Sequence, residues 1–398
     1  MKKLLWMLAV LLMLPVMSRA DSSISRVDGK QFPLVMFAVP GTDAHFKKVH
    51  DMGFDYVHIY GLTHGPVTDV VFKRIQTYLD LAQKHHLKVM LDLDGSRRVP
   101  TGDDGIADMR KVVQRFKNHP ALGFWYLYDE PELRKVSTPA VLLKYYQMIK
   151  EETPDIPVCI CTSTSSGKPG VDHKWYDFGD DYDILAFDTY PIRGQQFPTA
   201  HLETVTNFNK KAIALGEPVM PALQIFNFKA LPSYVKKAED AGQSTADWRY
   251  PNLQELRYWN FASLLQGARG MMYWSYMRAA TVENTDATWL DKTLKPATLE
   301  FREFTNLVQP ASEKEVLNIG AEKDIFFARW EKEGKQYLVL VNGESTARNI
   351  TDAAVLQSLN AGKLKAWKFT RADMLHIESG KVNQVELQPW EVAVWEIS

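Results

Sequence analysis

Short apolar runs alternate with longer amphipathic stretches along most of this 398-residue chain. Continuous apolar runs rich in branched and aromatic side chains are typical of buried strands, whereas apolar residues spaced three and four apart are typical of helices. Eight runs have the strand pattern, at residues 34–39, 56–60, 88–93, 122–128, 158–162, 183–188, 219–226 and 270–276. The helical pattern occupies segments 44–52, 68–86, 104–118, 139–152, 253–265 and 299–308.

Eight strand-helix repeats in one direction predict an α/β fold, a closed (β/α)₈ or TIM barrel over residues 21–310. A doubly wound open sheet is the alternative, but the Gly-rich first turn of such sheets is absent here. After the fifth strand, residues 167–181 are polar and irregular, so a helix is hard to place there. This segment and residues 227–252 are the long loops that barrel proteins use to build sites.

The pattern changes near residue 319 to short alternating runs separated by glycines. Residues 324–330, 336–342 and 392–397 read as antiparallel strands, and Gly334, Gly343, Gly362 and Gly380 supply the turns. We therefore expect a small all-β domain over residues 319–398 that follows the barrel. It either packs against the barrel or binds carbohydrate by itself.

The N-terminal residues have the features of a cleavable export signal. Lys2 and Lys3 precede an apolar run over residues 4–17, which is short for a membrane span, and Ser18-Arg19-Ala20 offers small residues for cleavage. A signal peptide of residues 1–20 predicts a periplasmic or secreted protein that is not inserted in the membrane after cleavage. An uncleaved N-terminal anchor is the alternative.

Composition narrows the classes of partner. A net charge of −1 without a basic stripe argues against nucleic acid. The 11 Trp and 16 Tyr residues suit sugar binding, although such residues also serve cores. Cys159 and Cys161, two apart on one strand, read as packed thiols and not as a disulfide or metal site. Neither a cofactor nor an oligomeric state is indicated.

The ends of the predicted strands carry acidic and aromatic side chains. In a (β/α)₈ barrel, catalytic groups lie at the carboxyl ends of the strands. The sequence has no P-loop, dinucleotide-binding turn, paired metalloprotease histidines or Ser-His pairing at these ends. Carboxyl and aromatic groups suit glycoside hydrolysis, in which one carboxylic acid protonates the leaving oxygen and a second carboxylate attacks or activates water. The residues at the strand ends are Tyr60, Asp92, Asp94, Asp129, Glu130, Asp188, Tyr190, Gln224, Trp274 and Tyr276.

Three segments resemble parts of a known group of enzymes. The run Trp125-Tyr126-Leu127-Tyr128-Asp129-Glu130-Pro131 resembles the fourth strand of the large clan of retaining (β/α)₈ glycosidases, which carries Asn-Glu-Pro there. The resemblance implies that Glu130 is an acid/base group. Residues 270–276 are similar to the clan's last strand, which implies that Trp274 forms the floor of a sugar subsite. Residues 387–396 resemble the closing strand of β-domains that follow such barrels.

The chain departs from this pattern at two positions. Asp129 stands where the clan has Asn, and two neighbouring carboxyls raise an apparent pKa of the pair, which favours a retained proton. Gln224 is nearest to the clan's nucleophilic Glu, and an amide cannot serve as that nucleophile. Glu217 lies at the opposite end of the strand.

Three explanations stay open for the missing nucleophile. A second carboxylate comes from another strand end, Asp188 first and then Asp92 or Asp94, which allows inversion if a water fits between the groups. Alternatively, Gln224 orients a substrate group that itself attacks. Finally, the protein binds a glycan without cleaving it.

The sequence therefore predicts an exported glycoside hydrolase that acts on an oligo- or polysaccharide, with a catalytically inactive glycan-binding barrel as the alternative. The predicted catalytic residues are Glu130, Asp129 and Asp188. The side chains predicted to contact the sugar are Tyr60, Asp92, Tyr190, Gln224, Trp274 and Tyr276.

Overall fold

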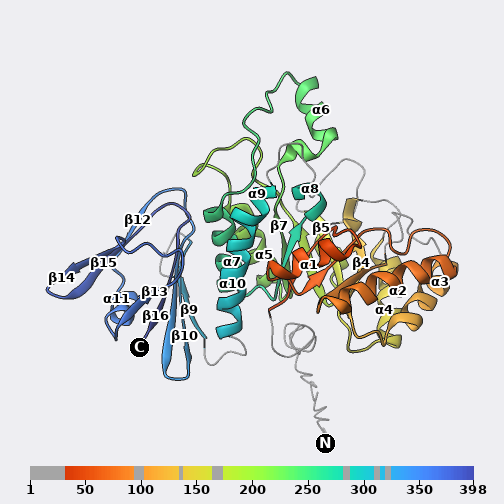
Figure 1. Ribbon diagram of the computed structural model, residues 1–398, viewed down its shortest axis with the longest axis horizontal. Coiled ribbons are helices and arrows are strands. Elements are labelled where there is room, and N and C mark those ends of the chain that lie inside the picture. Colours follow the sequence, from red (N-terminus) through yellow and green to blue (C-terminus); the bar gives the residue numbers. More distant parts are fainter. Residues whose placement is uncertain are drawn as a thin grey trace, which may run out of the picture.

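Eight parallel strands close into a barrel in sequence order, with β8 paired to β1 (Figure 1). The computed structural model describes residues 32–93, 103–133, 138–163, 174–280, 287–308, 314–318 and 324–398. The predicted signal peptide and Asp94 lie outside these ranges. The strands are β1 (Leu34–Met36), β2 (Tyr56–Val57), β3 (Lys88–Asp92), β4 (Leu122–Asp129), β5 (Val158–Ser163), β6 (Ile184–Asp188), β7 (Val219–Gln224) and β8 (Met271–Trp274). The predicted (β/α)₈ fold is confirmed.

Helices surround the barrel, and most of them bury one apolar face, whereas α7 is buried on nearly all sides. In α2, the stripe of Val71, Ile75 and Leu79 is buried, as its spacing predicts. The helix α4 begins where Thr138 accepts a hydrogen bond from the Val141 N–H. In the described ranges, no helix is long and apolar enough to cross a membrane. The main helices are α1 (Asp43–Asp51), α2 (Asp69–Lys84), α3 (Asp103–Phe116), α4 (Pro139–Glu152), α5 (Glu203–Ala214), α7 (Leu253–Gln266) and α10 (Lys295–Val308).

The strand alternation divides the core into an inner and an outer layer. Tyr126, Cys159 and Cys161 belong to the cluster that fills the barrel interior. Both cysteines are buried free thiols, as predicted. Trp125 points outward and its indole donates to Thr153 Oγ1 at 3.0 Å, which is a packing role.

Two helices after β6 and β7 were not predicted. The helix α5 is rich in Thr and Asn, so its helical periodicity is weak in the sequence. Within the loop 225–252 the chain forms α6 (Pro232–Asp240), which projects beyond the barrel at the top of Figure 1. Between β5 and β6, the described residues form only a short 3₁₀ turn at Trp175–Phe178, which agrees with the polar sequence there.

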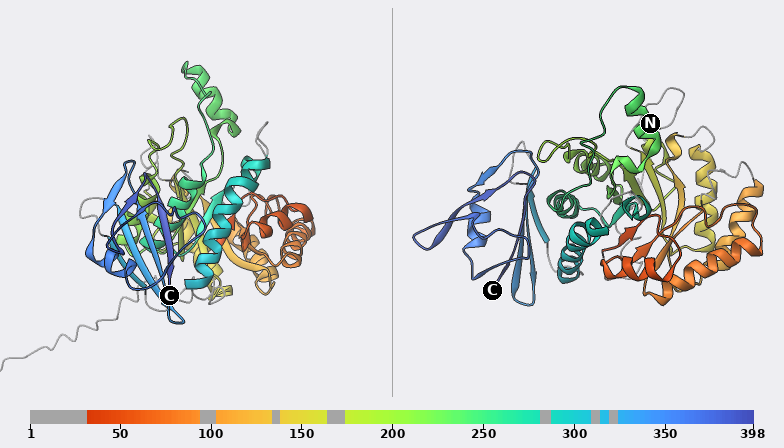
Figure 2. Two further views of the ribbon diagram at one scale, coloured as in Figure 1. Left: turned by 60° about the vertical axis from the view of Figure 1, so that its left-hand side comes forward. Right: turned by 45° about the horizontal axis from the view of Figure 1, so that its top comes forward.

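A β domain packs beside α7 and α10 (Figure 2). One antiparallel sheet contains, in spatial order, β13 (Leu364–Ala366), β16 (Val392–Ile397), β11 (Lys335–Asn342), β10 (Ile325–Lys332) and β9 (Lys314–Asn318). A second contains β12 (Arg348–Ile350), β15 (Lys381–Leu387) and β14 (Leu375–Glu378), and the helix α11 (Ala353–Leu359) accompanies them. Because β9 pairs with β10, this sheet begins before residue 319, where we placed its start.

Arg257 of α7 joins the barrel to the β domain. Its side chain is buried and forms two hydrogen bonds with Glu300 of α10, Nε to Oε2 at 2.7 Å and Nη2 to Oε1 at 3.0 Å. It also donates to the Val392 carbonyl of β16 at 3.0 Å. The β domain therefore packs against the barrel through a charged and fully buried connection.

Candidate active site

The ends of β4, β6 and β8 bring the predicted acidic and aromatic residues to one mouth of the barrel. Parallel strands place all their carboxyl ends at the same face of the barrel. Asp129, Asp188 and Trp274 are the last residues of their strands and therefore lie at this face. Adjacent strands in this ring pair β4 with β5 and β5 with β6. The candidate site is built from these strand ends and from the loops that follow them.

A bulge in β4 sets the direction of its acidic end. Its register against β5 shifts between Tyr126 and Tyr128, so that Asp129 pairs with Cys161, a residue of the barrel interior. The Tyr126 hydroxyl donates to Asp129 Oδ1 at 2.6 Å. A bulge exchanges the faces of all later residues of a strand, and strict alternation would have placed Asp129 outside with Trp125. Asp129 is thus held at the mouth by a tyrosine beneath it.

Glu130 follows in a strained backbone conformation. Its φ is +50°, in the left-handed region that side chains other than glycine rarely adopt, at a cost of about 1 kcal/mol. Its N–H donates to the Cys161 carbonyl oxygen at 2.6 Å, which fixes the turn against β5. The side chain is half-buried. Strain of this kind clusters at functional sites.

Glu132, which sequence reasoning missed, is a third carboxyl group of this turn. It lies in the short 3₁₀ turn Pro131–Leu133, is 1% exposed, and accepts a hydrogen bond from the Ser163 N–H at the end of β5. Burial raises its pKa to about 7, and the charges of Glu130 and Asp129 add to that effect. The repeated acid in Glu130-Pro131-Glu132 was the signal available in the sequence.

Asp188 completes the group of carboxyls from the β6 side. Burial raises its pKa well above the usual range, and the negative charges of Glu130, Asp129 and Glu132 raise it further. In the sheet, Asp188 pairs with Ser163 of β5. Of the predicted catalytic residues, the structure thus brings all three into one electrostatically linked cluster.

Aromatic rings form a wall beside the carboxyls. Tyr190 and Trp274 are stacked, with ring centroids 5.4 Å apart and planes inclined by 26°. Phe226 packs edge-on against Trp274 at 4.9 Å. Burial of the Tyr60 hydroxyl raises its pKa well above the usual range, and the negative charge of Asp129 adds to that effect. Tyr60 as a residue is 37% exposed, so its ring is accessible at the mouth.

His58 lies directly beneath this wall. Its ring packs against Phe37, Tyr60 and Tyr126 at centroid distances of 4.3, 4.5 and 4.9 Å. Burial lowers its pKa to about 3, so it is neutral at ordinary pH, and neither ring nitrogen has a hydrogen-bond partner in the described part of the chain. The fully buried His58 ring therefore fills the barrel interior.

Gln224 differs from a subsite residue in its contacts. It is fully buried, its Oε1 accepts from the Ile192 N–H at 2.9 Å, and its Nε2 donates to the Ile192 and Phe226 carbonyl oxygens at 2.6 and 3.0 Å. Both ends of the amide are occupied by backbone groups. We interpret Gln224 as a residue that holds the β6–α5 loop, in place of the sugar contact that we predicted.

Asp92 and Tyr276 also make structural contacts, one with a loop and one with a helix. Asp92 is 1% exposed and its Oδ2 accepts from the Gly61 N–H at 2.7 Å. The hydroxyl of the buried Tyr276 lies 2.9 Å from His45 Nδ1, a hydrogen bond between α8 (Tyr276–Ala280) and α1. Among the described residues, no group of three or more His, Cys, Asp or Glu side chains is arranged to hold a metal ion.

Comparisons with known proteins agree on the fold. No family model matches the sequence. The β-galactosidase BgaB of Geobacillus kaustophilus is 25% identical in an alignment 299 positions long, and the matched residues cover 56% of this chain. They cover 41% of BgaB, so the chain spans about two fifths of the length of this curated relative.

Solved structures of glycoside hydrolases superimpose on nearly the whole chain. One glycoside hydrolase has a TM-score of 0.60 at 12% identity and covers 92% of both chains. A family 39 enzyme from Bacteroides cellulosilyticus has a TM-score of 0.57 at 12% identity and covers 95% of this chain and 82% of its own. A family 5 enzyme from Bacteroides vulgatus has a TM-score of 0.57 at 13% identity and covers 92% and 88%. The chain therefore has the fold of barrel glycoside hydrolases, and the particular family stays open.

Proposed function

We propose that this protein is a glycoside hydrolase that cleaves an oligo- or polysaccharide by acid/base catalysis between the ends of β4 and β6. The observation that carries the proposal is the cluster of Asp129, Glu130 and Asp188 beside the Tyr190–Trp274 wall. Carboxyl groups transfer the protons of glycoside hydrolysis, and flat aromatic faces bind sugar rings.

The buried amide at the end of β7 favours direct attack by water over a covalent intermediate. The candidate carboxyls lie on β4 and β6, with β5 between them. Inverting glycosidases hold their two carboxyls roughly 6.5–9.5 Å apart to leave room for water, whereas retaining enzymes need about 5 Å. The amide of Gln224 takes the place where the resemblance puts a nucleophile. We therefore assign the pair Glu130 and Asp188 to an inverting mechanism.

The electrostatics of the pair suggests how the roles divide. Burial and the neighbouring carboxylates raise the pKa of Asp188, so this residue retains its proton in the resting site. Asp188 then protonates the leaving oxygen, and Glu130 accepts a proton from the attacking water. In this assignment Glu130 is the base, whereas the sequence resemblance implied that it also supplies the proton.

Substrates with different leaving groups test these roles. Glu130→Gln and Asp188→Asn are assayed on glycans and on aryl glycosides whose phenolate leaves without protonation. A variant without the acid should still cleave the aryl glycosides but not the glycans. A variant without the base should cleave neither substrate. In each case we expect kcat to fall by about 10²–10⁴-fold. We expect Asp188→Asn to behave as the acid variant and Glu130→Gln as the base variant.

Asp247→Asn, an exposed carboxyl on the β7–α7 loop, is the control and should keep full activity. NMR of the first product should show an inverted anomeric centre. Unchanged activity in both site variants would refute the proposal. Binding of a glycan by the wild type without cleavage would support the inactive binding protein instead.

We also propose that the protein is exported. The basic Lys2 and Lys3, the apolar run over residues 4–17 and the small residues before Asp21 support this. N-terminal sequencing of the protein recovered from the periplasm or medium should begin at Asp21. A product that keeps Met1 would contradict cleavage.

A further inference from the structure

The β6–α5 loop, residues 189–202, links the acidic cluster to the aromatic wall. It begins directly after Asp188 and carries Tyr190, which stacks on Trp274. Gln224 holds the loop at Ile192, as described above. Further along, the loop has no regular secondary structure, so other contacts must fix its path.

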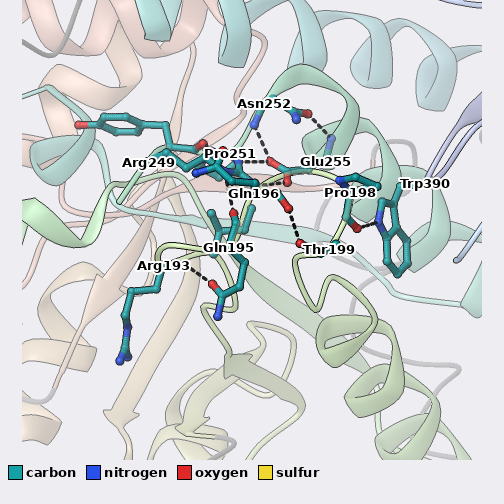
Figure 3. Close-up of polar contacts among 12 residues, drawn as sticks. Arg193, Gln195, Gln196, Pro198, Thr199, Arg249, Pro251, Asn252, Glu255 and Trp390 are labelled. Atoms are coloured by element: carbon teal, nitrogen blue, oxygen red, sulfur yellow. Dashed lines mark hydrogen bonds and ion pairs between the residues drawn. The ribbon is translucent and has the colours of Figure 1, made fainter. Parts of the chain in front are cut away.

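Arg249, from the β7–α7 loop, supplies these contacts (Figure 3). Its Nε donates to the Gln195 carbonyl oxygen at 2.9 Å. Its backbone N–H donates to the Arg193 carbonyl oxygen at 3.3 Å. A single residue thus binds the β6–α5 loop through both its main chain and its side chain.

The other edge of the guanidinium is fixed to helix α7. Arg249 Nη1 and Nη2 donate to the two carboxylate oxygens of Glu255 at 2.7 and 2.6 Å. Glu255 is fully buried and also accepts from the Asn252 N–H at 2.7 Å, as part of the cap that begins α7. The planar fork of arginine can satisfy a carboxylate and a carbonyl at once, which the ammonium of lysine cannot do in the same geometry.

The residue before Arg249 reaches the wall itself. Trp248 packs with Phe226 and Phe228, in a cluster to which Tyr190 and Trp274 also belong. The Asn227 side chain donates to the Trp248 carbonyl oxygen at 2.8 Å. The segment that contains Arg249 is therefore packed behind the Tyr190–Trp274 wall and hydrogen-bonded to the loop in front of it.

We propose that Arg249 is a positioning residue that fixes the path of the β6–α5 loop through its own contacts with Arg193 and Gln195, and so determines how tightly a sugar ring binds at Tyr190 and Trp274. The inference rests on the proposed function for its sugar ligand. Arg249 contacts none of the candidate carboxyls in the hydrogen bonds described, so its effect is on substrate binding and not on proton transfer.

The test compares Arg249→Lys with Glu255→Gln. Lysine keeps a positive charge beside Glu255 but loses the simultaneous contact with Gln195. In Glu255→Gln, the amide oxygen still accepts from the Asn252 N–H and Arg249 still reaches the loop, while the ion pair is lost. We expect KM to rise about tenfold in Arg249→Lys, with kcat and its pH profile within about twofold of wild type. In Glu255→Gln, we expect a lower Tm and a KM within about twofold of wild type.

Hydrogen exchange gives a readout that needs no activity. Amides of residues 190–198 should exchange about tenfold faster in Arg249→Lys than in wild type or Glu255→Gln. Unchanged exchange in this segment, or an equal rise in KM in both variants, would overturn the proposal. Faster exchange together with a wild type that cleaves no glycan would refute the proposed function and leave the positioning role standing. If Arg249→Lys does not fold, the double variant Arg249→Met/Glu255→Gln removes the buried charge and is measured instead.

Discussion

The side-chain amide of Gln224 forms two hydrogen bonds with the backbone of Ile192, accepting from its N–H at 2.9 Å and donating to its carbonyl oxygen at 2.6 Å. This pairing ties the end of β7 to the loop that follows β6. Where the glycosidases that the sequence resembles carry a reacting carboxylate, this chain has a buried amide bonded to the backbone. The function that we propose therefore draws its chemistry from other strand ends.

Gln224→Glu should not create a nucleophile. A carboxylate cannot donate, so it would face the Ile192 and Phe226 carbonyl oxygens with no hydrogen to share. We expect the free energy of unfolding to fall by about 3 kcal/mol, without any gain in activity. Thermal unfolding and the glycosidase assay measure both effects, and Gln83→Glu on the exposed face of α2 is the control. A variant as stable as wild type would contradict the assigned role of Gln224.

Glu132→Gln should change how stability depends on pH. The folded state holds the Glu132 proton up to a pKa of about 7, whereas the unfolded chain releases it near 4.5. The folded wild type therefore binds more protons between these values, and its stability falls as the pH rises through this window. Gln keeps the acceptor for the Ser163 N–H and cannot ionise.

The advantage of Glu132→Gln over wild type should grow to about 3 kcal/mol between pH 4.5 and pH 8. Chemical denaturation at several pH values measures this difference. A difference that does not vary with pH would show that Glu132 does not titrate in this range.

Tyr126→Phe should weaken catalysis with little loss of stability. The change removes the hydroxyl that orients Asp129, and water can take its place at the half-buried carboxylate. We expect kcat to fall about tenfold, the size of one lost hydrogen bond to a charged group. Tyr273→Phe is the control, because this buried tyrosine donates at 2.8 Å to Asn260, outside the carboxyl cluster. Equal loss of kcat in both variants would point to a general packing effect.

Trp390→Phe should loosen the connection between the β domain and the β6–α5 loop. The Trp390 indole donates to the Pro198 carbonyl oxygen at 2.7 Å, and its removal should lower the free energy of unfolding by about 1 kcal/mol. Trp367→Phe is the matched control. The buried Trp367 indole N–H has no acceptor in the described part of the chain, so only ring area is lost there. Equal changes in Tm would rule out a specific role for the Trp390 hydrogen bond.

The pattern of apolar and polar residues was enough to predict the architecture and the location of the candidate site. Apolar residues repeat with the period of the helix or strand that carries them, so eight alternating strand-helix units predicted the barrel. Because the strands of such a barrel are parallel, Glu130 and Asp188 lie at the same face. Two helices could not be predicted in this way. The periodicity of α5 is weak, and α6 lies inside a polar loop.

The surroundings of each residue at this face could be learned only from its tertiary contacts. The bulge after Tyr126 turns Asp129 inward, burial gives Glu132 a raised pKa, and backbone groups from another loop occupy Gln224. Each of these depends on distances between atoms far apart in sequence, which local patterns do not encode. The carboxyl cluster follows from the order of the strands, but the division of roles that we propose within it rests on the charges and hydrogen bonds that surround each group.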